Sequence, residues 1–257
     1  MKDHLEALLE SVEDLPDTIV VLSTVDSTQA MALRLLDQRS GEERCMGSAV
    51  ILARAQTRGV GRGNRTWTSP PGGLYLTWMA CHIEDSLLAR LPVLAAAAAL
   101  RMMEEVGVHA GVKWPNDLIL DGAKVGGLLV HARRGRLHWC AVGLGVNVSV
   151  LPELPPAEVV PVTCLADHCT GPVPTEEDIP RLAGAFITHL RRALADPASA
   201  HAIWEERLVH RPGEAISVRT GPSELVSGTY LGVTQEGHLR LDVAGAERTL
   251  ASGILEA

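Results

Sequence analysis

The 257-residue sequence has few aromatic residues and no excess of positive charge. Only 3% of its residues are aromatic, so each tryptophan is valuable to a hydrophobic core. The formal net charge is −8, whereas nucleic-acid-binding surfaces need clustered Lys and Arg to displace counterions. We therefore expect no nucleic-acid partner.

Long apolar runs are also missing. The most apolar stretch, Leu91 to Leu100, lies between Arg90 and Arg101 and is only about half as long as the roughly twenty residues that a membrane-spanning helix needs. The N-terminus has no basic segment followed by an apolar one, so no secretion signal is visible. These absences predict a cytoplasmic protein that does not contact membranes.

The cysteines show no pairing pattern. The chain has five, an odd number, and none in Cys-x-x-Cys spacing. Such usage favours free thiols in a reducing compartment over disulfides or zinc sites. Cys164, His168 and Cys169 lie close together, but a zinc site would need a fourth ligand that the sequence does not offer.

The remaining composition is that of an ordinary globular protein, with 46% hydrophobic and 21% charged residues. Hydrophobic patterns and turn residues predict helices at 3–13, 28–37, 87–106, 175–195 and 198–209. They predict strands at 19–25, 49–55, 74–81, 112–114, 117–120, 124–131 and 137–150. Four further short strands, at 216–219, 225–233, 239–243 and 248–254, predict a small barrel. The predicted organisation is an N-terminal extension (1–17), a main domain (18–210) and a C-terminal barrel domain (211–257).

The densest functional signal is the segment Gln56 to Trp67, which reads Gln-Thr-Arg-Gly-Val-Gly-Arg-Gly-Asn-Arg-Thr-Trp. Its glycines allow backbone N–H groups to close on an anion, and Arg58, Arg62 and Arg65 bring charges that pair with carboxylate or phosphate. These residues predict a loop that wraps a ligand; the alternative is a solvated surface loop. The segment does not match the glycine patterns of the two common nucleotide-binding folds, which are therefore disfavoured.

A second dense stretch follows between residues 111 and 150. Lys113-Trp-Pro-Asn-Asp117 joins a short strand to a hairpin whose turn is Asp121-Gly122. Gly143-Leu-Gly-Val-Asn147 lies inside the next strand. Glycines weaken a strand interior, so they often mark a close approach of backbone or ligand. Both motifs are candidates for the site over which the glycine loop closes.

These motifs, in this order, resemble those of the biotin protein ligases. The resemblance rests on Ser27-Thr28, the loop Gln56 to Trp67, Lys113 to Asp117, Lys124-Val-Gly-Gly-Leu-Leu129 and Gly143 to Asn147. It implies an α+β fold of the class II synthetase type: a mixed β-sheet with helices packed on one side, plus a small C-terminal SH3-like β-barrel. It also implies a short form, without the DNA-binding domain that some members carry before the first strand.

The activity implied by the resemblance has two steps. Biotin and MgATP give biotinyl-5′-adenylate and pyrophosphate, and a lysine of the biotin carboxyl carrier protein of acetyl-CoA carboxylase or a related carboxylase then attacks the adenylate. The first step brings two anions together, so positioned cations should supply most of the catalysis. The resemblance assigns catalysis to Lys113, Arg62, Arg65 and Asp117.

The same resemblance assigns the binding residues. Biotin is expected to contact Ser27, Thr28, Gln29, Gln56, Val60, Gly61, Arg62 and Lys113. ATP is expected to contact Arg62, Arg65, Trp67, Asn116, Lys124, Gly145 and Asn147. Asp117 is the candidate Mg²⁺ ligand, because hard cations take oxygen ligands; alternatively it helps to deprotonate the carrier lysine. Purely local roles compete with some assignments: helix capping at Ser27 and Thr28, loop anchoring at Gln56, and turn formation at Asn116 and Asp117.

Three positions depart from the family pattern: Gln29 stands in place of asparagine, Val60 of arginine and Asn64 of glycine. The missing guanidinium at Val60 predicts that the loop retains the adenylate less well. Two other functions stay open, a lipoate-type acyl-adenylate ligase and a non-catalytic biotin-binding or regulatory homologue. The latter is disfavoured by Lys113, Arg62 and Arg65 together, because binding biotin alone needs no phosphate-handling set. The oligomeric state is open between monomer and homodimer.

Overall fold

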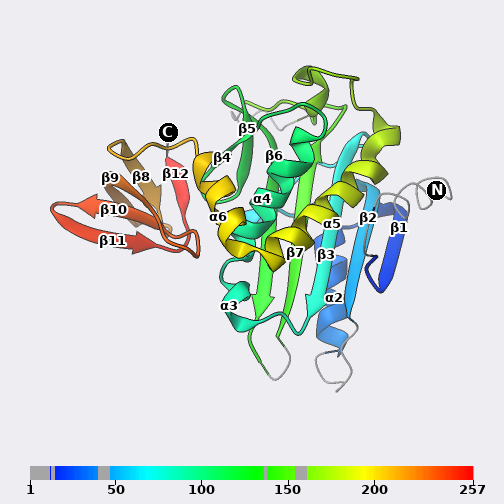
Figure 1. The fold of residues 1–257 in the computed structure, drawn as a ribbon, viewed down its shortest axis with the longest axis horizontal. Coiled ribbons are helices and arrows are strands. Elements are labelled where there is room, and N and C mark those ends of the chain that lie inside the picture. Colours follow the sequence, from blue (N-terminus) through cyan, green and yellow to red (C-terminus); the bar gives the residue numbers. More distant parts are fainter. Residues whose placement is uncertain (1–11, 13–14, 40–46, 136–137, 154–160, 257) are drawn as a thin grey trace.

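The computed structural model describes residues 12, 15–39, 47–135, 138–153 and 161–256. The helix expected at 3–13 lies outside these ranges. The described residues form a large mixed sheet with helices and a small second sheet near the C-terminus (Figure 1). Within them, no helix has the length and apolar character needed to cross a membrane.

The large sheet has seven strands in the order β1-β2-β3-β7-β6-β5-β4. β1 and β2 are parallel, with helix α2 (Thr28–Arg39) between them in the chain, and all other neighbours are antiparallel. The strands are β1 (Thr18–Val25), β2 (Ser48–Gln56), β3 (Gly73–Cys81), β4 (Gly111–Lys113), β5 (Asp117–Leu120), β6 (Ala123–Arg133) and β7 (Trp139–Asn147). Each strand predicted for the main domain is present, so the expected α+β mixed sheet is confirmed.

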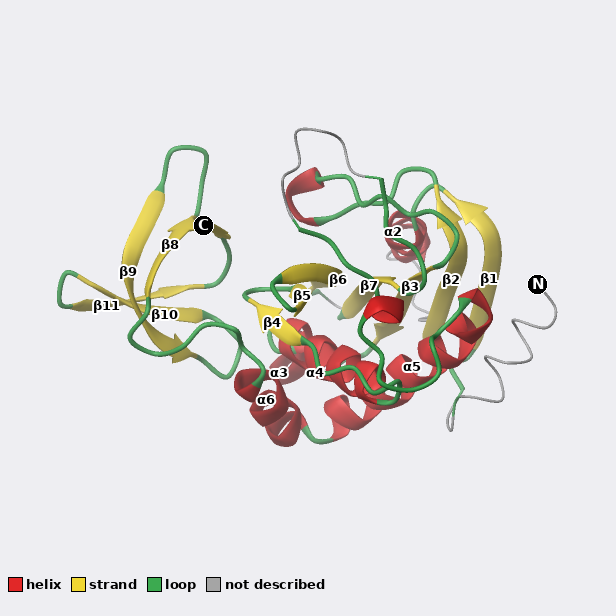
Figure 2. Cartoon of the chain, turned by 90° about the horizontal axis from the view of Figure 1, so that it is seen from above, coloured by secondary structure: helices red, strands yellow, loops and turns green. Residues whose placement is uncertain are grey.

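Helices cover both faces of this sheet (Figure 2). α4 (Leu91–Glu104) and α5 (Ile179–Ala195) pack on one face, where they share a core with Leu52. α2 packs on the other face, against Ile51 and Ala141. The prediction that the helices pack on one side of the sheet therefore holds for α4 and α5, but not for α2. The alternation of strand side chains gives both faces buried residues, and sequence patterns do not say which face a helix will take.

The helix predicted at 87–106 is two helices. α3 (Asp85–Leu88) ends before α4 begins, and Pro92 lies in the first turn of α4, where its missing N–H costs no hydrogen bond. α4 is buried on most of its surface because it lies among the sheet, α5 and α6 (Pro197–Glu206). The remaining helical turns are short: η1 (Arg62–Asn64), η2 (Leu165–Asp167) and η3 (Glu176–Asp178).

The C-terminal residues form a five-stranded antiparallel sheet in the order β11-β10-β9-β8-β12, consistent with an SH3-like domain. Its strands are β8 (Ala215–Arg219), β9 (Leu225–Val233), β10 (Leu239–Val243), β11 (Ala246–Leu250) and β12 (Ile254–Glu256). The single strand expected at 248–254 is wrong, because residues 251–253 are not part of a strand and separate β11 from β12. β12 pairs with β8 at the opposite edge of the sheet. The domain boundary near residue 211 stays a proposal.

The small sheet packs beside β4 of the large sheet. Trp114 Nε1 donates a hydrogen bond of 2.8 Å to Gly237 O. The connection between the sheets also pairs with β4: Val112 N donates to Arg207 O at 2.8 Å, and Val209 N donates to Val112 O at 3.0 Å. β4, which precedes Trp114, is thus hydrogen-bonded to β5 on one side and to the connection around residues 207–209 on the other.

The cysteines correct one expectation. Cys140, Cys164 and Cys169 are free thiols, but Cys81 is disulfide-bonded; Cys45 lies outside the described residues. Spacing along the chain does not report the distance between two cysteines in space, which decides whether they can be bridged. In the described ranges no group of three or more His, Cys, Asp or Glu residues could hold a metal ion, the segment from Cys164 to Cys169 included.

Candidate functional site

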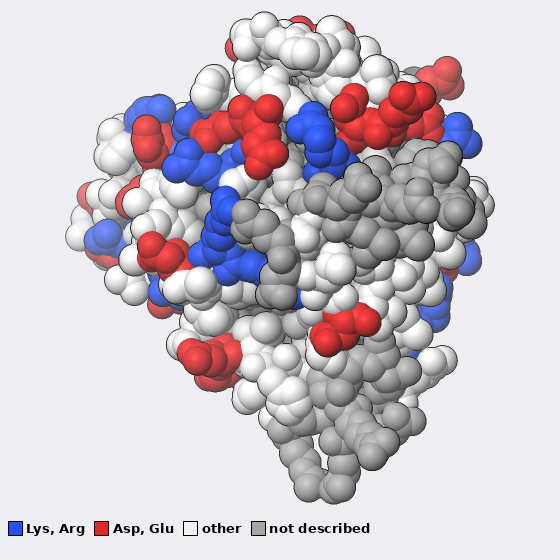
Figure 3. Space-filling model, turned by 45° about the vertical axis from the view of Figure 1, so that its right-hand side comes forward, with Lys and Arg blue, Asp and Glu red and all other residues white. Residues whose placement is uncertain are grey.

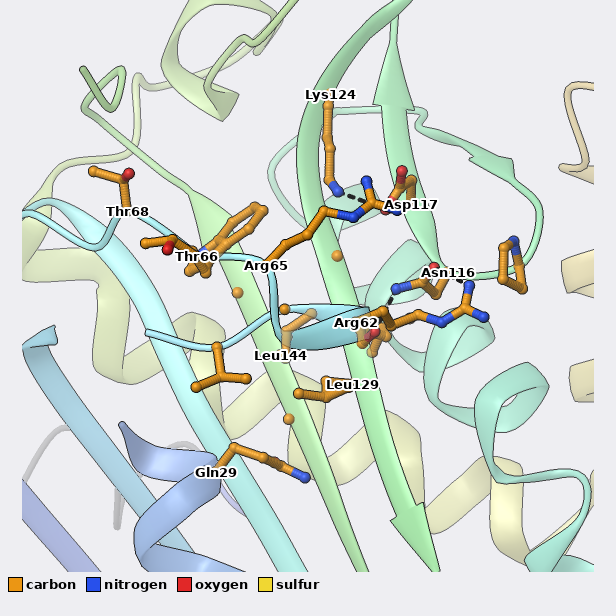
Figure 4. A pocket seen from close by; sticks show the side chains of 18 of the residues that line it. Gln29, Arg62, Arg65, Thr66, Thr68, Asn116, Asp117, Lys124, Leu129 and Leu144 are labelled. Carbon is orange, nitrogen blue, oxygen red and sulfur yellow. Dashed lines mark hydrogen bonds and ion pairs between the residues drawn. The ribbon is translucent and has the colours of Figure 1, made fainter. Parts of the chain in front are cut away.

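A pocket of about 420 Å³ opens beside the N-terminus of α2, next to strands β3, β6 and β7 (Figure 4). All the predicted site residues line it, although they come from well-separated segments of the chain: Ser27, Thr28, Gln29, Gln56, Val60, Gly61, Arg62, Arg65, Trp67, Lys113, Asn116, Asp117, Lys124, Gly145 and Asn147. The fold therefore brings the predicted residues into one cavity. Their individual roles stay predictions.

One end of the pocket, here called the neutral end, consists of uncharged polar side chains from Ser27, Thr28, Gln29, Gln56 and Thr77. Ser27 caps α2, since its Oγ accepts a hydrogen bond of 3.3 Å from Ala30 N. Gln56 Oε1 accepts hydrogen bonds from Thr28 N at 2.8 Å and from Thr28 Oγ1 at 3.2 Å. The capping role is therefore confirmed for Ser27, and the anchoring role is confirmed for Gln56, which binds Thr28. No capping bond from Thr28 is present among the described residues.

Thr77 joins the neutral end from the middle of β3 and is completely buried. Its hydroxyl lies 2.9 Å from Thr28 Oγ1 and 3.1 Å from Gln29 Oε1. Gln29 Nε2 donates to Ala141 O at 3.2 Å and lies 2.8 Å from His131 Nδ1. Thr77 was not among the predicted site residues, although a threonine hydroxyl in a mostly apolar strand needs a hydrogen-bond partner and was a usable signal.

The glycine loop is closed by hydrogen bonds within its own backbone. Trp67 N donates to Gly59 O at 2.8 Å, and Gly61 N donates to Arg65 O at 2.7 Å. Gly63, with φ of +62°, supplies the left-handed conformation at the tip. Gly59 is buried against Trp67 O, so a side chain at position 59 would clash with that oxygen. The loop has a defined hairpin-like shape beside the pocket.

Trp67 forms the wall between the loop and β7. A Cβ atom added to Gly145 would lie 2.7 Å from Trp67 Nε1, so only glycine allows the indole to approach the strand this closely. The buried Nε1 has no hydrogen-bond partner within the described part of the chain. Lys124 Nζ lies 5.3 Å from the ring centroid, a cation–π distance. The indole therefore lies directly against the strand, with a cation close by.

The other end of the pocket, here called the charged end, carries the cations Arg62, Arg65, Lys113 and Lys124 and the carboxylate of Asp117. Asp117 Oδ1 pairs with Lys124 Nζ at 2.6 Å (Figure 4). Among described residues, no carboxylate lies within ion-pair distance of Arg62, Arg65 or Lys113. On the face drawn in Figure 3, basic and acidic side chains are interspersed. The pocket cations are a local concentration of charge that suits an anion.

Arg62 links the glycine loop to the second sheet. Its Nη1 donates to Asn116 Oδ1 at 3.1 Å and to Gly253 O at 3.4 Å. Burial lowers the pKa of Arg62, an effect that the charge of Asp117 opposes and that of Arg65 reinforces. A partly buried guanidinium with only neutral acceptors would be stabilised by a bound anion.

Asn147 lies buried at the end of β7. Its Nδ2 donates to Thr163 O at 3.0 Å, and Thr163 N donates to Lys124 O, also at 3.0 Å. The amide nitrogen of Asn147 therefore holds the segment around Thr163 against the end of β7. Its Oδ1 is the group available to a ligand, because an amide oxygen accepts independently of the nitrogen.

The charged end does not form a ready-made magnesium site. Asp117 is the one carboxylate among the described lining residues, and Lys124 already pairs with it. Mg²⁺ is commonly bound through one or two carboxylates together with substrate phosphates. Asp117 could therefore supply at most one protein ligand to a magnesium ion that arrives bound to ATP.

Several lining residues were missed by the sequence reasoning. Leu129 and Leu144 form apolar walls between the two ends (Figure 4), and Pro152 and Val162 line the pocket from the connection after β7. The second sheet contributes Gly253, Ile254 and Leu255. These residues carry no local signal, because only the packing of the two sheets brings residue 253 to Arg62.

A pocket with a neutral hydrogen-bonding end, apolar walls and a cation-rich end defines a binding site for a small molecule that carries a neutral polar group at one end and anionic groups at the other. Residues 21–147 match the model of the biotin/lipoate A/B protein ligase family. Together with the relatives described next, this match shows that the chain belongs to that family.

The chain is 33% identical over 237 residues to the biotin–[acetyl-CoA-carboxylase] ligase of Paracoccus denitrificans, an alignment that covers 86% of this chain and 92% of the relative. It is 26% identical over 217 residues to the ligase of the same name from Mycobacterium tuberculosis, with 79% and 77% covered. The biotin protein ligase of Aquifex aeolicus, solved in complex with biotin and ATP, has the same fold, with a TM-score of 0.70 at 22% identity over 93% of this chain and 98% of that one.

Proposed function

We propose that this protein is a biotin–[acetyl-CoA-carboxylase] ligase. It activates biotin with MgATP to biotinyl-5′-adenylate and then transfers the biotinyl group to a lysine of a carrier domain. The observation that carries the proposal is the pocket itself: residues from separate motifs line one cavity with a neutral end, apolar walls and a charged end. A named relative with 33% identity over most of both chains supports the same activity.

In the proposed binding mode, biotin lies along the pocket. Its cyclic urea meets the hydroxyl and amide groups of the neutral end, its aliphatic chain follows Leu129 and Leu144, and its carboxylate reaches Lys113 at the charged end. Buried polar groups that already hydrogen-bond to one another hold their remaining lone pairs and protons in fixed directions, which favours one orientation of the ring.

For the first step, the proposed role of Lys113 is to stand between the biotin carboxylate and the α-phosphate. Oxygen of the carboxylate attacks phosphorus and pyrophosphate leaves, so negative charge gathers where Lys113, Arg62 and Arg65 point. Trp67 offers a flat surface for adenine. Asn147 offers an amide oxygen for a hydrogen-bond donor of the nucleoside.

For the second step, the carrier lysine attacks the carbonyl carbon of the adenylate and AMP leaves. Asp117 was a candidate for accepting the lysine proton. Its 2.6 Å ion pair with Lys124 favours a different role, in which Asp117 positions the lysine near Trp67 and the phosphate groups. We further infer a carboxylase carrier domain as acceptor and the cytoplasm, where ATP and carboxylases are found, as location. The disulfide at Cys81 is unusual for that compartment.

A single assay tests the proposal against its alternatives. The purified protein is incubated with MgATP and either biotin or lipoate, an acceptor carrier domain is added, and the adenylate and the labelled carrier are followed by mass spectrometry. We expect biotinyl adenylate first and biotinylated carrier second, with little lipoyl product. Lipoyl transfer alone would identify a lipoate-type ligase, and bound biotin without any adenylate would identify a non-catalytic binding protein.

A further inference from the structure

Gln29 at the neutral end contacts a histidine that lies outside the predicted site. Gln29 is buried at the start of α2, and its Nε2 lies 2.8 Å from Nδ1 of His131 on β6. The same Nε2 donates to Ala141 O at 3.2 Å, and Oε1 accepts a hydrogen bond from Thr77 Oγ1 at 3.1 Å. Both polar atoms of the Gln29 amide are therefore engaged.

These contacts determine which way the amide of Gln29 faces. A backbone carbonyl can only accept a hydrogen bond, so the contact with Ala141 O requires the NH₂ group on that side. The second N–H then points at His131 Nδ1, which must accept. His131 is therefore neutral, with its proton on Nε2. His131 lies on the exposed end of β6, yet partial burial of its ring lowers its pKa, which agrees with a neutral ring.

The orientation matters for what the pocket offers a ligand. With both N–H groups of Gln29 engaged, its oxygen is the polar group left for the cavity. A Cβ atom on Gly143 would lie 2.6 Å from Gln29 Oε1, so the oxygen rests close above β7. A carbonyl oxygen has two lone pairs and Thr77 uses one, so the other can accept a hydrogen bond from a ligand. Gln29 lies at the end of the pocket far from Lys124 (Figure 4).

We propose that His131 is a positioning residue: by accepting a hydrogen bond from Gln29, it fixes the amide so that the neutral end presents an acceptor to a ring N–H of the substrate. The inference rests on the proposed function. The cyclic urea of biotin has such N–H groups, whereas the dithiolane ring of lipoate has none. His131 thereby contributes to selection of a cyclic-urea substrate without touching it.

The contact also makes biotin affinity depend on pH. A proton on His131 Nδ1 would face the NH₂ group of Gln29, donor against donor, and the hydrogen bond would be lost. Charged side chains of β6 and α2 have ion-pair partners of their own: Arg133 pairs with Asp37 at 3.8 Å, and Arg34 pairs with Asp26 at 2.7 Å. On β7 the same face carries Trp139, Ala141 and Gly143, none of which titrates. Affinity for biotin should therefore fall as the pH drops through the pKa of His131 and be constant above it.

The test compares the wild type with His131→Leu, His131→Gln and the control His109→Leu. His109 is a surface histidine outside the pocket, with 68% of its side chain exposed. Adenylate formation is measured by pyrophosphate release over a range of biotin and ATP concentrations. The pH is varied between about 4.5 and 7.5, a range that extends below the usual histidine titration because the pKa of His131 is lowered. Glutamine supplies an amide oxygen that accepts the same hydrogen bond but does not titrate.

For His131→Leu we expect the KM for biotin to rise about fivefold to tenfold, the loss of one hydrogen bond, with kcat and the KM for ATP unchanged. His131→Gln should keep the wild-type KM near neutral pH and lose its pH dependence, and His109→Leu should match the wild type throughout. An unchanged biotin KM in His131→Leu, or the same pH profile in the wild type and His131→Gln, would overturn the inference. If the wild type forms no biotinyl adenylate, the proposed function itself has failed.

Discussion

The two ends of the pocket differ in how far their polar groups are satisfied before any ligand binds. At the neutral end, Thr28, Gln56, Thr77 and Gln29 hydrogen-bond to one another and to the backbone, and all of them except the half-buried Gln56 are buried. At the charged end, by contrast, Lys124 pairs with Asp117, but Lys113, Arg62 and Arg65 have no carboxylate within ion-pair distance among the described residues. Recognition of a neutral ring is therefore built into the fold, whereas charge balance at the other end requires an anion.

The difference implies that the two ends can be damaged separately. Leu129 and Leu144 lie between them and carry no polar group through which a change could pass. Substitutions at the charged end should act on the use of ATP and on the chemical step, and substitutions at the neutral end on biotin affinity.

The largest effect is expected for Lys113→Met, which removes the cation proposed to stand between the two reacting anions. The rate of adenylate formation should fall by about 10³-fold, as for the loss of other groups that stabilise transition-state charge. Pyrophosphate release measures this rate. Because the neutral end is intact, biotin binding measured by calorimetry without ATP should weaken less than the rate falls, by about 10- to 100-fold, the contribution of one charged hydrogen bond.

Lys113→Arg serves as the matched control for charge. A guanidinium is wider and binds in a planar fork, so it should restore less than about a tenth of the rate even though it keeps the charge. If Lys113→Met formed adenylate at the wild-type rate, the proposed role of Lys113 would be wrong.

Two neighbouring glycines on β7 offer the sharpest test of the separation. A methyl group at Gly145 would meet Trp67 Nε1 at 2.7 Å, and one at Gly143 would meet Gln29 Oε1 at 2.6 Å. Gly145→Ala should therefore raise the KM for ATP, and Gly143→Ala the KM for biotin, each by about 10- to 100-fold, as expected for overpacking. Steady-state kinetics with each substrate varied in turn checks this. If both variants raised the same KM, the two ends would not be independent.

Features of the fold and the site that depend on short segments of sequence could be predicted, and features that depend on packing between distant segments could not. Strands β1 to β7 were visible because apolar runs and turn residues are written into short segments, and the predicted site residues were found because their motifs resemble a known family. The face that α2 takes and the break at residues 251–253 depend on packing between distant segments. The pairing of β3 with β7, which places Thr77 opposite Gly143, also depends on packing between distant segments.

The site shows the same limit at the level of single residues. Gly145 was suspected because a glycine inside a strand is locally unfavourable, and its contact with Trp67 agrees with that suspicion. His131 was not suspected, because nothing near it in sequence needs a histidine. Only the register of β6 against β7 brings it opposite Ala141 and within reach of Gln29.

The smallest effect is expected at Val60, where the loop has a valine in place of the family's arginine. Val60 is 39% exposed, lines the pocket and forms an isolated bridge with Thr66. Val60→Arg adds a cation to a loop that already has a defined backbone, so it should change how long the adenylate stays rather than how fast it forms. The added charge is partly in water, so we expect adenylate dissociation to slow by no more than about fivefold.

A chase of labelled adenylate with excess unlabelled biotin measures the rate of adenylate dissociation. Val60→Met, of similar length but uncharged, should dissociate like the wild type, and the difference between the two variants should shrink in high salt. Equal rates for all three proteins at low salt would show that the valine does not weaken retention.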